Sequence, residues 1–384
     1  DLITVTEELR KRKELEAVGG ASYLAQLTAS VPTAANVEHH ARIVKEKALL
    51  RHLITAATKI VQEGFDATAE GSQVLDHAER MIFDISQHRV EGSFIRINEI
   101  IKGSIEAIDR LYQRKEHVTG LATGFHEFDS KTAGLQPSDL IVVAGRPSMG
   151  KSALVSGIAE HVSVVLGKPI AFFSLEMSKE QLVQRMLCSH ARVDAQKVRT
   201  GYLSHSDWPK LTSAAGKLSE APLFIDDTPV MNALELRAKA RRLKAQHGIE
   251  LVVVDYLQLL EGRVRAENRQ QEITEISRSL KALSRELRGP VIAISQLSRA
   301  VESRTGNRPQ LSDLRESGAI EQDADLVVFL FREEYYHPTE ENRNRAEAII
   351  AKQRNGPTGS VDLIFLKEWT RFDNPEFRRE EAGL

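Results

Sequence analysis

The sequence has a single cysteine and no long apolar run. Because the one cysteine, Cys188, cannot form a disulfide within the chain, a disulfide scaffold is excluded and a reducing cytosol is the expected compartment. We interpret Cys188 as a small buried residue without a catalytic role. No stretch approaches the roughly 18 continuous apolar residues of a membrane-spanning helix, so we expect a cytoplasmic protein without membrane spans.

The chain also lacks an excess of charge of one sign. Its net charge of −2 gives no support by itself to nucleic-acid binding. One local basic cluster lies on a predicted helix, and the ordinary interpretation of such a cluster is a solvated face. Its residues are Arg237, Lys239, Arg241, Arg242 and Lys244. At 384 residues the chain has room for two or three domains.

A phosphate-binding loop is the strongest motif present. An apolar run, residues 140–144, leads into G-x-x-x-x-G-K-S, and a helical pattern follows. In such a P-loop the backbone N–H groups cradle phosphate oxygens, the lysine reaches the β- and γ-phosphates, and the hydroxyl can bind Mg²⁺. The sequence therefore predicts a site for ATP and Mg²⁺. Its residues are Gly145, Arg146, Pro147, Ser148, Met149, Gly150, Lys151 and Ser152.

The region from 119 to 384 alternates short apolar runs with helical segments. The first five runs have long, mostly helical connections, which predicts parallel strands in an α/β domain. The later runs are closely spaced, so we expect antiparallel pairing at one edge of the sheet. The predicted strands are 140–144, 170–174, 223–225, 251–254, 291–294, 326–331, 348–351 and 361–365.

The part of the chain before residue 119 is predicted to be mostly helical, with loop-like stretches at 87–93 and 113–124. Residues 1–92 form one helical region, in which the segments 37–61 and 74–85 could pair as an antiparallel hairpin, with Gly64 as a stop. Within the linker 93–118, one helix carries a clean apolar stripe. This stripe packs either on its own domain or on a neighbouring subunit. It comprises Ile97, Ile100, Ile101, Ile105, Ile108, Leu111 and Tyr112.

Polar side chains follow three of the predicted strands. Glu176 could orient or deprotonate an attacking water, and Asp255 ends an apolar run in the manner of a Walker B aspartate that holds Mg²⁺. Gln296 could sense the γ-phosphate through hydrogen bonds. Because ligands gather at the carboxyl ends of strands in open α/β sheets, we expect all three near the P-loop.

Two further segments carry charge close to glycine. Lys352 and Arg354 precede Gly356, and such a pair suits either an anion or ordinary solvent exposure. Arg315 and the backbone near Gly318 could hold a phosphate backbone, although the pattern alone is a weak signal.

Taken together, the motifs resemble those of the bacterial replicative DNA helicases, the DnaB family. They occur in family order over about residues 119–372. The segments that carry the resemblance are 119–129, 133–137, 146–151, 174–178, 254–259, 267–272, 294–299, 313–323 and 351–359. Residues 1–10 resemble the interior of the family's N-terminal domain. Since the chain also begins at Asp1 without Met, we expect it to be an N-terminally incomplete piece.

The resemblance implies a RecA-like ATPase that assembles as a ring of six. It assigns Lys151 and Ser152 to phosphate and metal, Glu176 to catalysis, Asp255 to the Walker B position and Gln296 to the γ-phosphate. It also implies that Lys352 and Arg354 enter the adjacent subunit's site, and that the 97–112 helix clasps the neighbouring core. Arg315, Glu316 and Gly318 match the loop that follows single-stranded DNA.

We therefore expect a replicative DNA helicase that acts on forked DNA, with primase and a helicase loader as implied partners. Two other functions stay open on sequence alone. One is a related RecA-like ATPase that coats DNA for recombination. The other is an inactive ring that recruits primase or a loader.

Overall fold

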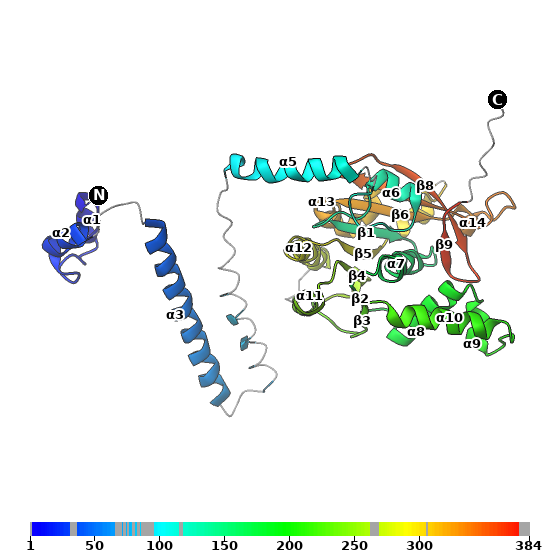
Figure 1. Cartoon of the computed structure of the whole chain (residues 1–384), viewed down its shortest axis with the longest axis horizontal. Helices are drawn as coiled ribbons and strands as arrows, with labels where there is room; N and C mark the ends of the chain where they lie inside the picture. The colour runs from blue at the N-terminus through cyan, green and yellow to red at the C-terminus, as the bar shows by residue number, and fades with distance from the viewer. Residues whose placement is uncertain are drawn as a thin grey trace. The chain divides into compact units, whose positions relative to one another are not determined.

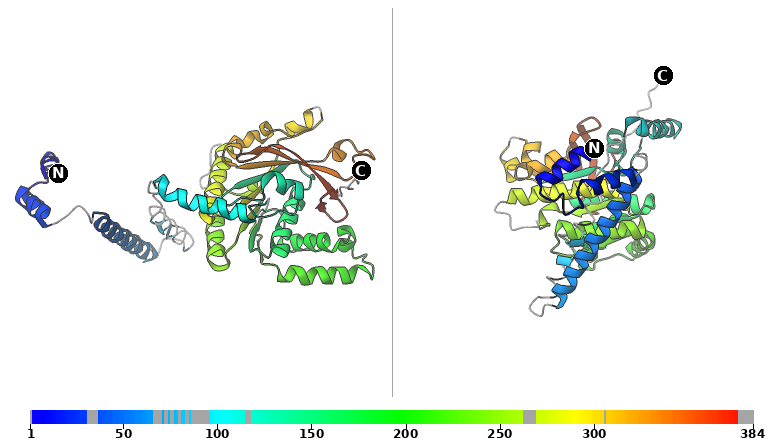
Figure 2. Two further views of the ribbon diagram at one scale, coloured as in Figure 1. Left: turned by 45° about the horizontal axis from the view of Figure 1, so that its top comes forward. Right: turned by 90° about the vertical axis from the view of Figure 1, so that its left-hand side faces the viewer.

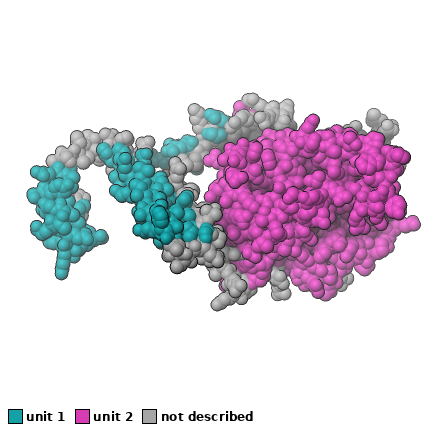
Figure 3. Space-filling model, turned by 90° about the horizontal axis from the view of Figure 1, so that it is seen from below, with its two compact units in different colours: residues 1–106 teal, residues 107–384 magenta. Residues whose placement is uncertain are grey.

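The computed structural model describes residues 2–30, 37–65, 96–114, 118–261, 269–304 and 306–375, with a few positions between 71 and 85. The chain divides into two compact units, residues 1–106 and 107–384 (Figure 3). None of the helices in the described ranges combines the length and apolarity that a bilayer crossing requires. The unit boundary falls inside a helix, so the predicted boundaries at 92 and 118 stay predictions.

The first unit is helical in all its described elements, as predicted. Its helices are α1 (Leu2–Lys11), α2 (Gly20–Ser30) and α3 (Val37–Phe65). The prediction that Gly64 stops the third helix is slightly wrong, because α3 continues to Phe65. Most of the predicted hairpin's second arm, 74–85, lies outside the described residues. One contact supports the hairpin: His77 Nδ1 lies 2.7 Å from Glu63 Oε2 of α3.

The predicted linker helix is α5 (Ile97–Arg114). Four isoleucines of its apolar stripe are described, and all four are exposed, from 47% for Ile101 to 75% for Ile97. The side chains of Ile100, Leu111 and Tyr112 lie outside the described residues. These four isoleucines are therefore largely uncovered by the residues that the structure describes.

The second unit is built on one nine-stranded sheet among the described residues (Figure 1). Its order is β3-β2-β4-β5-β1-β6-β7-β8-β9. All eight predicted strands are confirmed, several of them longer by one or more residues, while β9 went unpredicted because it has only three residues. The strands are β1 (Leu140–Gly145), β2 (Ile170–Ser174), β3 (Leu223–Asp226), β4 (Leu251–Asp255), β5 (Val291–Gln296), β6 (Leu326–Phe331), β7 (Arg345–Gln353), β8 (Gly359–Leu366) and β9 (Arg371–Asp373).

Parallel pairing extends from β3 to β6, and β6 to β9 pair antiparallel. This confirms the expectation drawn from connection lengths, because parallel neighbours need long crossovers and antiparallel ones do not. The strands β1, β2, β4 and β6 are buried along their whole length. Helices on both faces of the parallel part account for that burial.

Helices cover the two faces of the sheet in two groups (Figures 1 and 2). One apolar core joins the sheet to α6 (His126–Thr132), α7 (Lys151–Glu160) and α8 (Lys179–Ala191). The other joins it to α11 (Ala233–His247), α12 (Arg269–Leu287) and α13 (Gly318–Asp323). The shorter or peripheral elements are η2 (His161–Val165), α9 (Ala195–Thr200), α10 (Asp207–Glu220), η3 (Leu257–Leu259), η4 (Arg299–Ser303), η5 (Leu311–Ser317) and α14 (Glu333–Tyr336).

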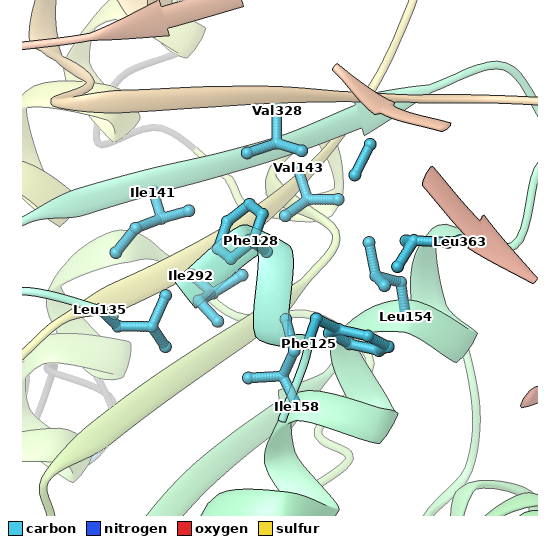
Figure 4. Close-up of a pocket in the computed structure, with 11 residues that line it drawn as sticks. Phe125, Phe128, Leu135, Ile141, Val143, Leu154, Ile158, Ile292, Val328 and Leu363 are labelled. Carbon is cyan, nitrogen blue, oxygen red and sulfur yellow. The ribbon is translucent and has the colours of Figure 1, made fainter. Parts of the chain in front are cut away.

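A small void lies in the first core, between α6, α7 and the sheet (Figure 4). All eleven of its lining residues are apolar, among them Phe125, Phe128 and Ile158, and it holds about 10 Å³. A water needs about that much room together with polar partners, which this lining does not supply. We therefore interpret the void as imperfect packing and not as a ligand site.

Candidate functional site: a nucleotide pocket at the carboxyl ends of four strands

The register of the sheet brings the predicted site residues together. Ser174 of β2 lies opposite Asp255 of β4, and Gly145 of β1 lies opposite Gln296 of β5. Because β2, β4, β5 and β1 are successive neighbours, their last residues form one continuous row. We call this row the P-loop edge. The opposite ends of the same strands, where the parallel strands begin, form the amino edge.

The loop between β1 and α7 has the backbone of a phosphate cradle. Ser148 and Gly150 have φ angles of 67° and 99°, and Gly150 is the residue before the first turn of α7. A Cβ on Gly150 would lie 2.9 Å from Phe372 Cε2, so both its conformation and its surroundings favour glycine. The helix therefore starts at Lys151 with its N–H groups facing the loop.

Two side chains of the predicted loop face away from the pocket. Met149 is 1% exposed and belongs to the apolar core. Arg146 donates from Nη1 to the Leu297 carbonyl at 2.8 Å and from Nε to Glu302 Oε1 at 2.9 Å. These contacts attach the loop to η4, so only the backbone of Arg146 and Met149 is available to a phosphate.

A pocket of about 400 Å³ lies over this loop, within the range of small-molecule sites. It brings Lys151, Ser152, Glu176 and Gln296 together, as the sequence predicted. Asp255 lies beneath them, 2% exposed. The complete lining is Pro147, Ser148, Gly150, Lys151, Ser152, Ala153, Glu176, Arg185, Tyr256, Gln296, Phe365 and Thr370.

Glu176 lies in a turn held from two sides. The Ser174 hydroxyl donates to the Met177 carbonyl at 2.7 Å, and the Leu175 N–H donates to the Asp255 carbonyl at 2.7 Å. The Glu176 side chain itself is exposed. It is therefore a solvent-facing carboxylate on a fixed turn, next to the phosphate loop.

Burial controls the charges of the pocket. It raises the pKa of Asp255, against the hydrogen bond from Ser152 that lowers it. It lowers the pKa of Lys151, against the carboxylates of Asp255 and Glu176 that raise it. Asp255 Oδ1 is buried without a hydrogen-bond partner among the described residues, which is costly unless a cation satisfies it. One carboxylate and one hydroxyl, completed by phosphate oxygens, suit Mg²⁺.

Arg185 of α8 is the main pocket residue that the sequence analysis missed. Burial lowers the pKa of its guanidinium, while Asp255 and Glu176 raise it. It follows Glu176 by nine residues, and no motif marked it, because an arginine inside a helix is ordinary. Only the packing of α8 over the loop brings Arg185 into the pocket.

Lys352 and Arg354 lie at the amino edge, away from the P-loop of their own chain. Lys352 pairs with Val327 near the start of β6, whereas the P-loop follows the end of β1. Burial lowers the pKa of Lys352, as does the Arg354 charge. The two cations and the P-loop therefore stand at opposite edges of one sheet.

The predicted DNA segment lies at the start of α13. Arg315 and Glu316 belong to η5 and Gly318 begins α13, so the expected polar loop is in fact two short helical elements. The side chains of Arg315 and Glu316 lie outside the described residues. Gly318 has an ordinary φ of −52°, and a Cβ there would meet no atom within 4 Å. Nothing in the described fold requires a glycine at this position.

Two minor predictions can now be compared with the structure. The basic cluster on α11 is partly engaged within the chain: Arg237 and Arg241 pair with Glu286, and Lys239 with Asp226. The solvated-face interpretation thus needs correction, since α12 and β3 supply partners. Cys188 is 1% exposed and burial raises the pKa of its thiol, which confirms a small buried residue.

A strand, a phosphate cradle, a buried aspartate at the end of β4 and this sheet order define the class, a P-loop ATPase with a RecA-like core. The structure is similar to a solved structure described as an ATPase domain, at 39% identity and a TM-score of 0.71, over 74% of this chain and all of that one. It is also similar to a chain from "The Structure Of A DnaB-Like Replicative Helicase And Its Interactions With Primase", at 35% identity and a TM-score of 0.78, over 98% and 88% of the two chains.

The chain belongs to the DnaB-like replicative helicase family. The family model of the DnaB-like helicase C terminal domain matches residues 120–374, and that of the N terminal domain matches residues 1–46. Replicative DNA helicase DnaB of Geobacillus stearothermophilus is 53% identical over all of this chain and 85% of its own length. Replicative DNA helicase DnaC of Bacillus subtilis is 51% identical over the same shares. These similarities decide against the recombination ATPase.

Proposed function

We propose that this chain is one subunit of a ring-shaped replicative helicase that couples ATP hydrolysis to movement along single-stranded DNA. The observation that carries this proposal is the separation of its charged groups. The phosphate cradle and its carboxylates lie at the P-loop edge, and two cations lie at the amino edge of the same sheet. Such a chain can complete a nucleotide site only by pairing with another copy.

Within one subunit, the residues at the P-loop edge take complementary roles. Lys151 would contact the β- and γ-phosphates, while Ser152 and Asp255 would hold Mg²⁺, which would neutralise charge on the phosphates. Glu176 orients the attacking water from its solvent-facing turn. Gln296, at the end of the neighbouring strand, hydrogen-bonds the γ-phosphate.

The neighbouring subunit supplies Lys352 and Arg354. Charge develops on the γ-phosphoryl oxygens in the transition state, and cations fixed there stabilise it more than the ground state. Arg354 is 45% exposed on its side chain, so a partner surface can reach it. Hydrolysis would then be sensitive to the subunit interface, which a moving ring requires.

The DNA segment, Arg315, Glu316 and Gly318, follows the phosphate backbone of the single strand. Gly318 supports this role because neither its backbone conformation nor its surroundings require glycine, whereas close approach of a phosphate backbone does. Few base contacts are expected, since a motor must ignore sequence. A ring repeats the segment, so the net charge of −2 on each chain is no obstacle.

The apolar stripe of α5 supports assembly. Its exposed isoleucines need a cover, and a neighbouring subunit of a homohexamer offers one. We propose that the helical N-terminal unit meets primase and a helicase loader, and that forked DNA is the substrate.

The decisive experiment is Arg354→Ala. We expect nucleotide binding to stay nearly normal and ATP turnover with single-stranded DNA to fall about 10³-fold, because a trans-acting arginine acts mainly in the transition state. Arg199→Ala, on the peripheral helix α9, is a surface control. Normal turnover of the Arg354 variant would refute the trans-acting role.

Mixing variants tests whether the site is shared. Arg354→Ala subunits keep an intact P-loop edge, and Glu176→Ala subunits keep intact cations. Mixed rings should therefore recover activity at interfaces that combine the two. No recovery in rings shown to be mixed would place both residues in one subunit's site. A forked duplex then reports whether turnover drives unwinding.

A further inference from the structure

The carbonyl end of α13 binds both proposed trans-acting cations. Lys352 Nζ donates to the carbonyls of Glu321, Gln322 and Ala324, the last at 2.7 Å, and Arg354 Nη2 donates to the Gln322 carbonyl at 2.8 Å. We call these three carbonyls the carbonyl cluster. Exposed carbonyls at a helix end attract cations. The carbonyl cluster therefore fixes the positions of the Lys352 and Arg354 side chains within their own subunit.

Asp325, one residue further on, is a buried hub with a side chain 7% exposed. Its Oδ2 accepts from the Leu140 N–H at 2.8 Å and from Lys281 Nζ at 2.5 Å. Its Oδ1 lies 3.5 Å from Arg354 Nε. One carboxylate thus connects the start of β1, helix α12 and the guanidinium.

The two cations differ in how many N–H donors they have available for a phosphate. An ammonium has three donors, and Lys352 has three carbonyl partners. A guanidinium has five, and only Nε and Nη2 of Arg354 have partners among the described residues. Arg354 can therefore contact a phosphate without leaving Asp325, whereas Lys352 must exchange a carbonyl for it.

The helix that supplies the carbonyls begins at the DNA segment. Helix α13 runs from Gly318 to Asp323, about 9 Å at 1.5 Å per residue. Its last residue is fixed to α12, where the Ser277 hydroxyl donates to Asp323 Oδ2 at 2.9 Å. A shift at Gly318 can reach the carbonyl cluster only if α13 moves as one short body about this anchor.

We propose that Asp325 is a positioning residue for Arg354, and that α13, through the carbonyl cluster, links the DNA segment to the neighbouring subunit's nucleotide. This inference rests on the trans-acting role proposed for Arg354. Asp325 itself touches no nucleotide. It fixes the guanidinium from behind and leaves the remaining N–H groups for the γ-phosphate.

The test is Asp325→Asn in the full chain. The amide can still accept from the Leu140 N–H, but it loses the charge that pairs with both Arg354 and Lys281. We expect kcat to fall about 10- to 100-fold, the effect of a misplacement near 1 Å, with KM for ATP nearly unchanged. The ratio of turnover with and without a single-stranded oligonucleotide should also fall. Asp129→Asn, another buried carboxylate, whose hydrogen-bond partners among the described residues are Thr123 and Gly124 and neither cation, controls for lost stability and should keep kcat.

A double-mutant cycle separates positioning from general damage. If Asp325 acts through Arg354, then Asp325→Asn should change kcat little in an Arg354→Ala background. If the two substitutions instead lower kcat by independent factors that multiply in the double variant, the proposal is overturned. Mixed rings add a second readout. Asp325→Asn subunits should recover turnover when they are mixed with Glu176→Ala subunits. If the substitution instead damaged the P-loop edge of its own subunit, mixing would give no recovery.

The outcomes also distinguish this inference from the proposed function. Normal kcat in Asp325→Asn beside a defective Arg354→Ala would overturn positioning alone. Normal kcat in Arg354→Ala would overturn the trans-acting role and the inference with it. A fall in kcat with an unchanged DNA stimulation ratio would overturn the link through α13.

Discussion

The two edges of the sheet differ in how their charges are satisfied. At the P-loop edge, the buried Oδ1 of Asp255 lacks a partner among the described residues, and Glu176 faces solvent. At the amino edge, Asp325 accepts hydrogen bonds from Lys281 and the Leu140 N–H, and its Oδ1 lies 3.5 Å from Arg354 Nε. One edge is arranged to receive a ligand and the other to hold a side chain in place. That difference fits the proposal of a nucleotide site shared between copies.

The same comparison bears on the proposal that the nucleotide site is shared between two subunits. Lys352 and the P-loop lie at opposite ends of the strands of one rigid sheet, so no side-chain motion joins them. In the proposed ring, each amino edge would meet the next subunit's P-loop edge. The predictions below probe each edge separately, from the largest expected effect to the smallest.

Asp255→Asn should have the largest effect. Because the carboxylate and Ser152 are the proposed metal ligands, we expect Mg²⁺-dependent turnover to fall about 10³-fold. Nucleotide binding without Mg²⁺ should change little, as measured by titration with a fluorescent analogue. Asp226→Asn is the matched control, since Asp226 also ends a strand but pairs with Thr228 and Lys239. Retained Mg²⁺-dependent turnover in Asp255→Asn would contradict this assignment.

Arg185→Ala should have an intermediate effect. The guanidinium lies in the pocket with Lys151 and Glu176, so we expect nucleotide affinity to fall about tenfold, as for the loss of a charge-assisted hydrogen bond. Because Arg185 acts within its own subunit, mixing with Glu176→Ala should give no recovery, unlike Arg354→Ala. Arg192→Ala, an exposed arginine at the end of α8, is the control. Recovery on mixing would show that Arg185 acts in a neighbouring subunit's site, and would contradict this prediction.

Asp139→Asn at the amino edge should have the smallest effect, on stability alone. Burial and the nearby Asp325 carboxylate raise the pKa of Asp139 to about 6, against Lys281 and Arg354, which lower it. Between pH 4 and 6 the folded state holds more protons than the unfolded state, so stability falls as pH rises through this window.

The asparagine variant removes that penalty. We expect about 1 kcal/mol more stability at pH 8, allowing for solvent screening, and a Tm higher by about 2–4 °C. The gain should vanish near pH 4, where the wild-type carboxyl is protonated. Thermal unfolding at both pH values measures this. An equal gain at pH 4 and pH 8 would show that the charge is not its source.

The strands were predictable because each buried parallel strand is a short apolar run bounded by polar residues. The run 251–254 could only be a buried strand between helical patterns, and the structure extends it by the Asp255 that follows. The three-residue β9 is too short to give any pattern. Gly64 was expected to stop α3, yet a helix tolerates one glycine at a cost of about 1 kcal/mol.

The site was predictable where a motif is local, and not where it depends on packing. Lys151 and Ser152 lie beside a glycine loop in sequence, so their role is readable there. Arg185 enters the pocket only because α8 packs over the loop. Arg146, which belongs to the motif, turns away from it to Glu302, a contact between residues 156 apart in sequence.

The sequence by itself determined the class of chemistry, because phosphate binding depends on a contiguous loop whose glycines, lysine and serine are adjacent in the chain. It also determined the fold class, because the buried face of each helix or strand sets the spacing of apolar residues along the sequence. Only the tertiary structure decided which groups share an edge, since strand order and register are long-range choices. That is why Asp325, which no sequence motif marked, is recognised only in the fold as the carboxylate beside Arg354.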